Sequence, residues 1–102
     1  MHKLVVLYPT PTDPTQFEDY YRTVHLPLAQ KLPGALALRF SLSIDSAAVP
    51  SPYFAVFEAD FVDAAAMAAA MASQAGRAVE ADVPNYATGG ATVLNYPVES
   101  LA

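Results

Sequence analysis

A proline inside a helical segment is the feature that most restricts how this chain can fold. Residues 20–28 read YYRTVHLPL, with Pro27 two positions after His25. Proline donates no backbone hydrogen bond and clashes with the carbonyl four residues back, here that of Thr23. A regular helix should therefore bend or end near Leu26. Histidine is the side chain best suited to proton transfer near neutral pH, so the same segment is a candidate site.

The start of this helix is clearly marked in the sequence. Asp13 suits the N-cap, Pro14 the first helical position and Gln16 the third position of a capping box. Apolar side chains then recur at steps of four, three and four, which predicts one buried helical face: Phe17, Tyr21, Val24 and Leu28. Pro33-Gly34 closes the segment.

A second helix is predicted in the C-terminal half of the chain. Asp63 suits its N-cap, and Ala64 to Ser73 is almost wholly alanine apart from two methionines. Gly76 is typical of a helix end, and residues 77–83 add another turn or two before Pro84. Strand patterns, alternating or continuously apolar, occupy the segments 3–8, 35–44, 53–61 and 91–96, with a loop at 45–52.

The resulting order is β-α-β-β-α-β, the ferredoxin-like arrangement, with two helices on one face of a four-stranded antiparallel sheet. We expect one α+β domain over residues 1–102. The strands at 3–8 and 53–61 are apolar on both sides, so the face without helices also needs cover. The chain is 54% hydrophobic and 15% charged, against about 25% charged in average proteins. We therefore expect a homodimer in which two sheets pair into a dimeric α+β barrel.

Composition excludes several classes of function. A net charge of −5 argues against nucleic-acid binding, and no apolar stretch is long enough to span a membrane. Cysteine is absent, the two histidines lie far apart, and no glycine-rich nucleotide loop occurs, so we expect neither metal nor cofactor. We see no signal peptide and expect a cytoplasmic protein.

The candidate site residues are aromatic, amide and thioether side chains. His25 and Tyr21, four positions apart on one side of the helix, are the candidates for proton transfer. A ligand cavity would be lined by these residues: Tyr8, Tyr86, Tyr96, Asn85, Met67 and Met71. The alternatives are structural: tyrosines and methionines in the core, and an imidazole that bonds the carbonyl freed by Pro27. For Arg39 and Glu58 an ion pair or a dimer contact is favoured.

Several of these residues together resemble a known family. Tyr8-Pro9, Asp13-Pro14, the Tyr-x-x-x-His-x-Pro-Leu core within residues 20–28, and Leu32-Pro33-Gly34 are similar to the EthD family, named after ethyl tert-butyl ether degradation. The resemblance implies the dimeric α+β-barrel superfamily, whose members include cofactor-free monooxygenases, isomerases, cyclases and heme enzymes. It also implies an accessory role beside a cytochrome P450 in ether degradation. It assigns no catalytic role to His25 or Tyr21.

Two functional hypotheses follow. The first is a small enzyme without metal or nucleotide that binds a hydrophobic organic molecule, with His25 moving a proton and Tyr21 orienting the substrate or His25. The second is a non-catalytic accessory protein that binds a metabolite or supports a partner oxygenase. A heme bound through His25 is a third and weaker hypothesis.

Overall fold

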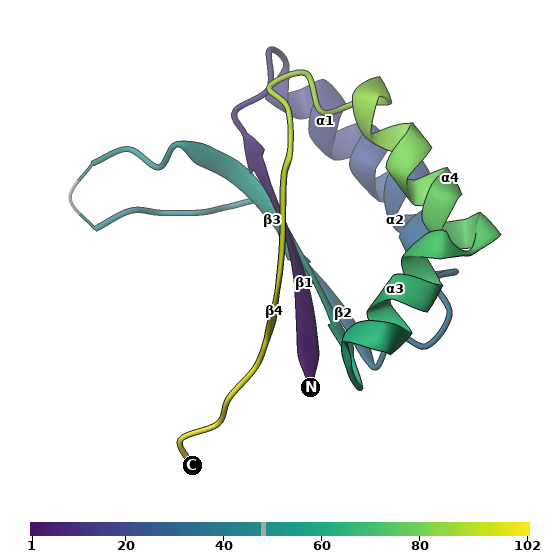
Figure 1. Ribbon diagram of the computed structural model, residues 1–102. Helices are drawn as coiled ribbons and strands as arrows, with labels where there is room; N and C mark the ends of the chain where they lie inside the picture. Colours follow the sequence, from purple (N-terminus) through teal and green to yellow (C-terminus); the bar gives the residue numbers. More distant parts are fainter. Residues whose placement is uncertain (48) are drawn as a thin grey trace.

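The computed structural model describes residues 1–47 and 49–102 as one antiparallel sheet and a layer of helices. Figure 1 views the sheet edge-on, with every helix on the same side of it. The elements, in chain order, are β1 (His2–Pro9), α1 (Pro14–Tyr20), the π-helical turn η1 (Tyr21–His25), α2 (Leu26–Ala29), β2 (Ala37–Ser41), β3 (Tyr53–Phe61), α3 (Ala64–Ala72), α4 (Gln74–Asp82), the 3₁₀ turn η2 (Val83–Asn85) and β4 (Thr92–Pro97).

The strand order in the sheet is β2-β3-β1-β4, with every neighbouring pair antiparallel. The two longest strands, β1 and β3, lie at the centre, and β2 and β4 form the edges. This arrangement confirms the predicted ferredoxin-like fold class. No helix in the described part of the chain is long and apolar enough to cross a membrane.

The two faces of the sheet have different environments. Alternate residues of β1, including Leu4 and Tyr8, point toward the helices and are buried. Val5 and Leu7 point the other way, where no helix covers them, and we call that side the open face. The buried hydrophobic core lies between the helices and the sheet, and its large fully buried side chains are Tyr8, Tyr21, Phe17 and Phe61.

The predicted fault at Pro27 takes the form of a π-helical turn rather than a helix end. The backbone N–H of Leu26 bonds the carbonyl of Tyr21, five residues back, and the chain continues as helix to Ala29. The wide turn accommodates a proline that has no N–H to donate. One consequence is that Tyr21 and His25 stack, with ring centroids 5.3 Å apart and 20° between their planes.

One predicted strand is shorter than expected, whereas the predicted loop that follows it agrees with the structure where it is described. The strand expected over 35–44 is confined to Ala37–Ser41, because the Ser41 hydroxyl bonds the backbone of Ser43 and turns the chain away from β3. The loop expected at 45–52 contains no helix or strand in its described residues, and Ala48 lies outside them.

The sequence predicted that the alanine-rich helix ends at Gly76, and this was wrong. That helix stops at Ala72, because Ser73 is extended and its hydroxyl caps α4 by accepting from the Gly76 backbone N–H. Gly76 lies inside α4, where an added Cβ would collide with the carbonyl oxygen of Ala70 and with Met71. A glycine there lets the two helices meet at a close corner.

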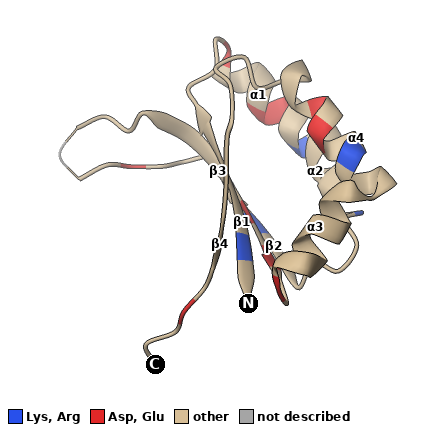
Figure 2. Cartoon of the chain, in the orientation of Figure 1, with Lys and Arg blue, Asp and Glu red and all other residues tan. Residues whose placement is uncertain are grey.

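Charged residues gather at one end of the sheet (Figure 2). Arg39 stands opposite Glu58 in register, but the ion pair that was one of the two alternatives for them does not form between these residues. The Arg39 guanidinium instead donates to the Asp60 carboxylate at 2.6 and 2.9 Å, and Lys3 Nζ donates to Glu58 at 2.9 Å. The four charges therefore pair among themselves on the open face.

Candidate functional site

A chain of hydrogen bonds connects a carboxylate, an imidazole and two phenols beneath the helix layer. Asp82 Oδ2 lies 2.9 Å from His25 Nδ1, and His25 Nε2 lies 2.9 Å from the Tyr86 hydroxyl. The Tyr86 hydroxyl lies 2.7 Å from that of Tyr8. All four residues are buried, with exposed fractions of 7% or less. This series is called the Asp82–Tyr8 chain below.

Four different elements bring these side chains together. Tyr8 lies near the end of β1, and His25 is the last residue of the π-helical turn. Asp82 is the last residue of α4, and Tyr86 follows the 3₁₀ turn that begins directly after it. The site therefore forms only when both helical segments pack on the sheet.

The carboxylate at one end of the chain is held in its ionised form. Burial acts to raise the pKa of Asp82, but hydrogen bonds from Tyr20, Asn85 and His25 outweigh it and lower that pKa overall. Tyr20 donates to Asp82 Oδ1 at 2.6 Å and Asn85 Nδ2 donates to the same oxygen at 3.0 Å. An ionised carboxylate only accepts, so the hydrogen in the His25–Asp82 bond lies on Nδ1.

The imidazole itself is neutral near pH 7. Burial lowers the pKa of His25 below its ordinary value of 6.5, and the opposing effect of Asp82 does not cancel that shift. Burial also raises the pKa of Tyr8, Tyr21 and Tyr86, so none of these phenols holds a negative charge. The only favourable place for a proton that enters the chain is His25 Nε2.

Tyr21 lies beside the Asp82–Tyr8 chain without belonging to it. Its ring packs on those of Tyr8, His25 and Tyr86, with centroids 5.3 to 5.6 Å apart. The side chain is fully buried, and its hydroxyl has no hydrogen-bond partner among the described residues. An unpartnered buried hydroxyl is uncommon, and burial together with the neighbouring Tyr8 raises the pKa of this one.

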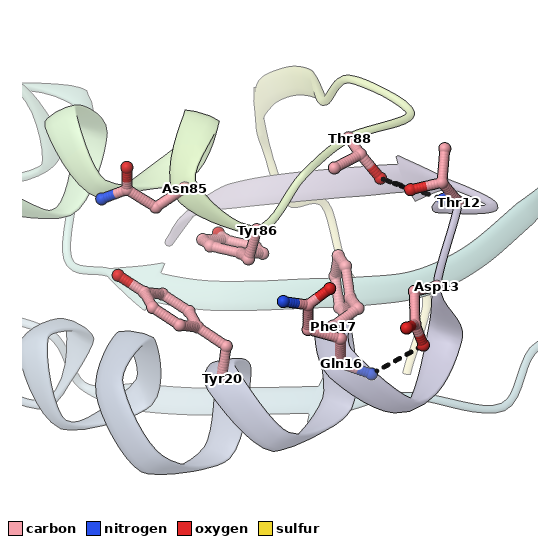
Figure 3. Close-up of a pocket in the computed structure, with 8 residues that line it drawn as sticks. All are labelled: Thr12, Asp13, Gln16, Phe17, Tyr20, Asn85, Tyr86 and Thr88. Atoms are coloured by element: carbon pink, nitrogen blue, oxygen red, sulfur yellow. Dashed lines mark hydrogen bonds between the residues drawn. The ribbon is translucent and has the colours of Figure 1, made fainter.

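Two clefts border the Asp82–Tyr8 chain. The first is a polar groove of about 180 Å³, drawn in Figure 3, where Tyr20, Asn85 and Tyr86 come together with residues at the start of α1. The second, which we call the apolar cleft, has a volume of about 420 Å³ and lies between the sheet and α4. Its walls are Leu4, Val6, Tyr8, Leu32, Phe57, Met71, Val79, Glu80, Val83, Ala91 and Val93. Tyr86 therefore borders the groove, and Tyr8 borders the cleft.

The predicted site residues separate into those that meet and those that do not. His25, Tyr21, Tyr8 and Tyr86 come together, and the imidazole bonds Asp82 and Tyr86 rather than the Thr23 carbonyl. Asn85 joins the cluster through Asp82, and Met71 lines the apolar cleft.

Two predicted residues lie elsewhere. Met67 packs against the core and does not line the cleft. Tyr96 of β4 pairs with Lys3 of β1, points to the open face and is 45% exposed. The structure therefore does not bring it to the cluster. Successive side chains of a strand point to opposite faces of the sheet, so a residue on the open face cannot reach the helices.

Sequence reasoning missed Asp82 and Tyr20. The available signal for Asp82 was its spacing, because it lies three residues after Val79 on a helix whose buried face includes both. An acidic residue on a buried helical face requires partners, and His25 and Tyr20 are two of them. Within residues 1–47 and 49–102, no group of three or more metal-ligating side chains occurs.

The fold and the buried site define a ferredoxin-like α+β protein with a histidine-centred polar chain beside an apolar cleft. The chain belongs to the EthD family, because the EthD domain model matches residues 9–90. An uncharacterized 11.0 kDa protein of Rhodococcus erythropolis, from the thcB-thcC intergenic region, is 31% identical over 94 residues. That match covers 92% of this chain and 91% of the relative.

Solved structures agree with this assignment. An ethyl tert-butyl ether degradation (EthD) family protein from Bacillus halodurans has a TM-score of 0.90 and 26% identity, covering 97% of this chain and 99% of that one. A dimeric ferredoxin-like protein of unknown function from Thermobifida fusca has a TM-score of 0.73 and 15% identity, covering 95% and 90%. This second likeness concerns the fold alone.

Proposed function

We propose that the protein binds a small, mainly apolar organic molecule in the apolar cleft and that His25 exchanges a proton with it. The observation that carries the proposal is the Asp82–Tyr8 chain, since it connects a neutral imidazole to a residue that lines the cleft. Hydrogen-bonded hydroxyls can pass a proton over this distance without either phenol becoming charged. The family name suggests a role in the degradation of alkyl ethers or related xenobiotics, and the molecule that is bound must carry an exchangeable hydrogen, which an ether itself lacks.

Binding and the link to His25 can be tested together by NMR with para-nitroanisole, a neutral apolar probe. We expect the probe to shift the amide resonances of Met71, Val79 and Val83, and to shift the imidazole resonances of His25 through the two hydroxyls. Val79→Phe should fill the cleft and abolish these shifts. Val62→Phe, on an exposed surface position, is the matched control and should preserve them. Shifts that avoid the cleft, or that leave His25 unchanged, would overturn the proposal.

A non-catalytic binding protein is the second candidate function. It is favoured by the walls of the cleft, where Glu80 is the one charged residue and the Tyr8 hydroxyl already has a partner. Under this hypothesis His25 is a structural residue that satisfies Asp82. His25→Asn would then leave the turnover of a candidate substrate unchanged, whereas the proton-exchange proposal requires a large loss.

We further propose that the open face packs against a second copy of the chain. Leu94 and Tyr96 of β4 are 47% and 45% exposed on that face, beside Val5, Leu7 and Val56. Exposed apolar surface of this kind is typical of an interface. The dimeric fold relative supports the same assembly. Sedimentation at micromolar concentration should give twice 10.8 kDa, and a stable monomer would contradict the proposal.

A further inference from the structure

The direction of the hydrogen bonds specifies which kind of molecule the apolar cleft can accept. This inference rests on the proposed function, because it concerns the ligand of the same cleft. It starts from the hydrogen that ionised Asp82 requires on His25 Nδ1. Neutral His25 then has a lone pair and no hydrogen on Nε2, so Tyr86 must donate its hydroxyl hydrogen to that nitrogen.

Each later bond in the chain follows from the one before it. A phenol has a single hydroxyl hydrogen, and that of Tyr86 is committed to His25. The 2.7 Å bond between the Tyr86 and Tyr8 hydroxyls therefore has Tyr8 as its donor. Tyr8 then has no hydrogen left for a ligand, and its oxygen can only accept. A molecule that meets Tyr8 in the cleft must supply a hydrogen.

The charges around the cleft restrict the ligand further. Glu80 lines the cleft and the protein carries a net charge of −5, so a ligand that enters the cleft as an anion is disfavoured. The other residues that line the cleft are apolar apart from Tyr8. A carboxylic acid, which is ionised near pH 7, fits these walls poorly, whereas a neutral molecule with one weakly acidic hydroxyl fits them well.

We propose that the ligand of the apolar cleft is a neutral hydroxylated compound, such as a phenol or an enol, which donates its O–H to Tyr8. The Asp82–Tyr8 chain then works as a general base. The ligand O–H bond breaks and its proton passes to the Tyr8 oxygen, the Tyr8 hydrogen passes to Tyr86, and the Tyr86 hydrogen passes to His25 Nε2. The products are the ligand oxyanion and an imidazolium beside Asp82, so protons and charges balance. The hydroxyl of Tyr8 then donates to the oxyanion.

The test compares para-nitrophenol with para-nitroanisole, which differ by one methyl group on the oxygen. Affinities are measured by calorimetry at a pH between the pKa of His25 and that of the phenol, where both are neutral. Transfer from water alone favours the more apolar anisole. We expect the wild-type protein to bind the phenol about tenfold more tightly, the size of one net hydrogen bond.

Two variants test the direction of the hydrogen bonds in the Asp82–Tyr8 chain. Tyr8→Phe removes the acceptor, so the preference for the phenol should disappear. Tyr86→Phe leaves Tyr8 without its own acceptor, so Tyr8 can donate to a ligand and the preference should shift toward the anisole. Tyr53→Phe, a tyrosine at the start of β3 outside both clefts, is the matched control and should keep the wild-type ratio.

The outcomes separate this inference from the proposed function. Binding of both probes without preference for the phenol would overturn the donor inference and leave ligand binding intact. Binding of neither probe by the folded protein would overturn the proposed function. An unchanged phenol preference in both Tyr8→Phe and Tyr86→Phe would show that another group accepts the hydroxyl, and would also overturn the inference. Binding of para-nitroanisole reports that each variant is folded.

Discussion

The helix layer has two halves, and they cover the sheet with different side chains. In the half formed by α1, η1 and α2, Phe17 and Tyr21 pack with Tyr8 and Tyr86 as interlocked rings 5.1 to 5.6 Å apart. In the other half, α3 is alanine at every position except Met67 and Met71. Rings fill the space above the sheet and hold hydroxyls at defined positions. Alanines bring α3 near the sheet but fill little volume, and the apolar cleft lies on that side of the layer.

The aromatic half should be the more sensitive to loss of a side chain. Phe17 is 2% exposed and contacts the rings of Tyr8, Tyr21, Phe54 and Tyr86. We expect Phe17→Ala to lower the free energy of unfolding by about 3–5 kcal/mol, because rigid rings cannot collapse into the void. Urea unfolding measures this change. A loss below about 1 kcal/mol would mean that the rings are not closely packed.

The alanine half should respond differently at two positions. Ala70 on α3 is 1% exposed, and Ala70→Phe should destabilise the protein by about 1–3 kcal/mol through overpacking. Val79 on α4 borders the cleft, so Val79→Phe should extend into open volume and change stability by less than about 1 kcal/mol. Equal losses in the two variants, measured by thermal or urea unfolding, would contradict the presence of free space beside α4.

The smallest expected effect is a pH dependence that originates in the aromatic half. The titratable groups that face His25 are Asp82, Tyr86 and Tyr21. Because the pKa of His25 is lower in the folded state, the unfolded chain takes up a proton first as the pH falls below 6.5. Stability is therefore full above that pH and decreases below it, with a slope of at most about 1.4 kcal/mol per pH unit.

His25→Asn should reduce this slope, because the substituted side chain does not titrate. Urea unfolding of both proteins between neutral pH and the pKa of His25 makes the comparison. Asp82 acts in the same direction at more acidic pH, since its pKa is also lowered on folding. An identical slope in the two proteins would mean that His25 has the same pKa in both states.

The fold was predictable from the sequence because its signals are local. Asp13 and Asp63 cap helices where predicted, accepting hydrogen bonds from the backbone N–H of Gln16 and Ala66. The strand predicted at 53–61 matches β3 in full. The extent of β2 and the break at Ser73 were not predictable, because both depend on hydrogen bonds made by single serine hydroxyls.

The site was predictable in part. His25 was conspicuous beside Pro27, and a tyrosine cluster around it followed from the position of β1 and the C-terminal region. Its most consequential partner, Asp82, lies 57 residues away along the chain, and only the packing of α4 against η1 and α2 brings the two together. The sequence alone could not show that Tyr96 points away from the cluster. A shift of one residue in the register of a strand reverses the face to which each side chain points.

At the corner between α3 and α4, the width of the cleft depends on the absence of a side chain at Gly76. Gly76 sits against the Ala70 carbonyl, Met71 on α3 forms one wall of the cleft, and Val79 and Val83 form the wall across from it. A side chain at position 76 would force the two helices apart at their joint and alter the distance between those walls. The width of the cleft is thus governed from outside it, by a residue that does not line it.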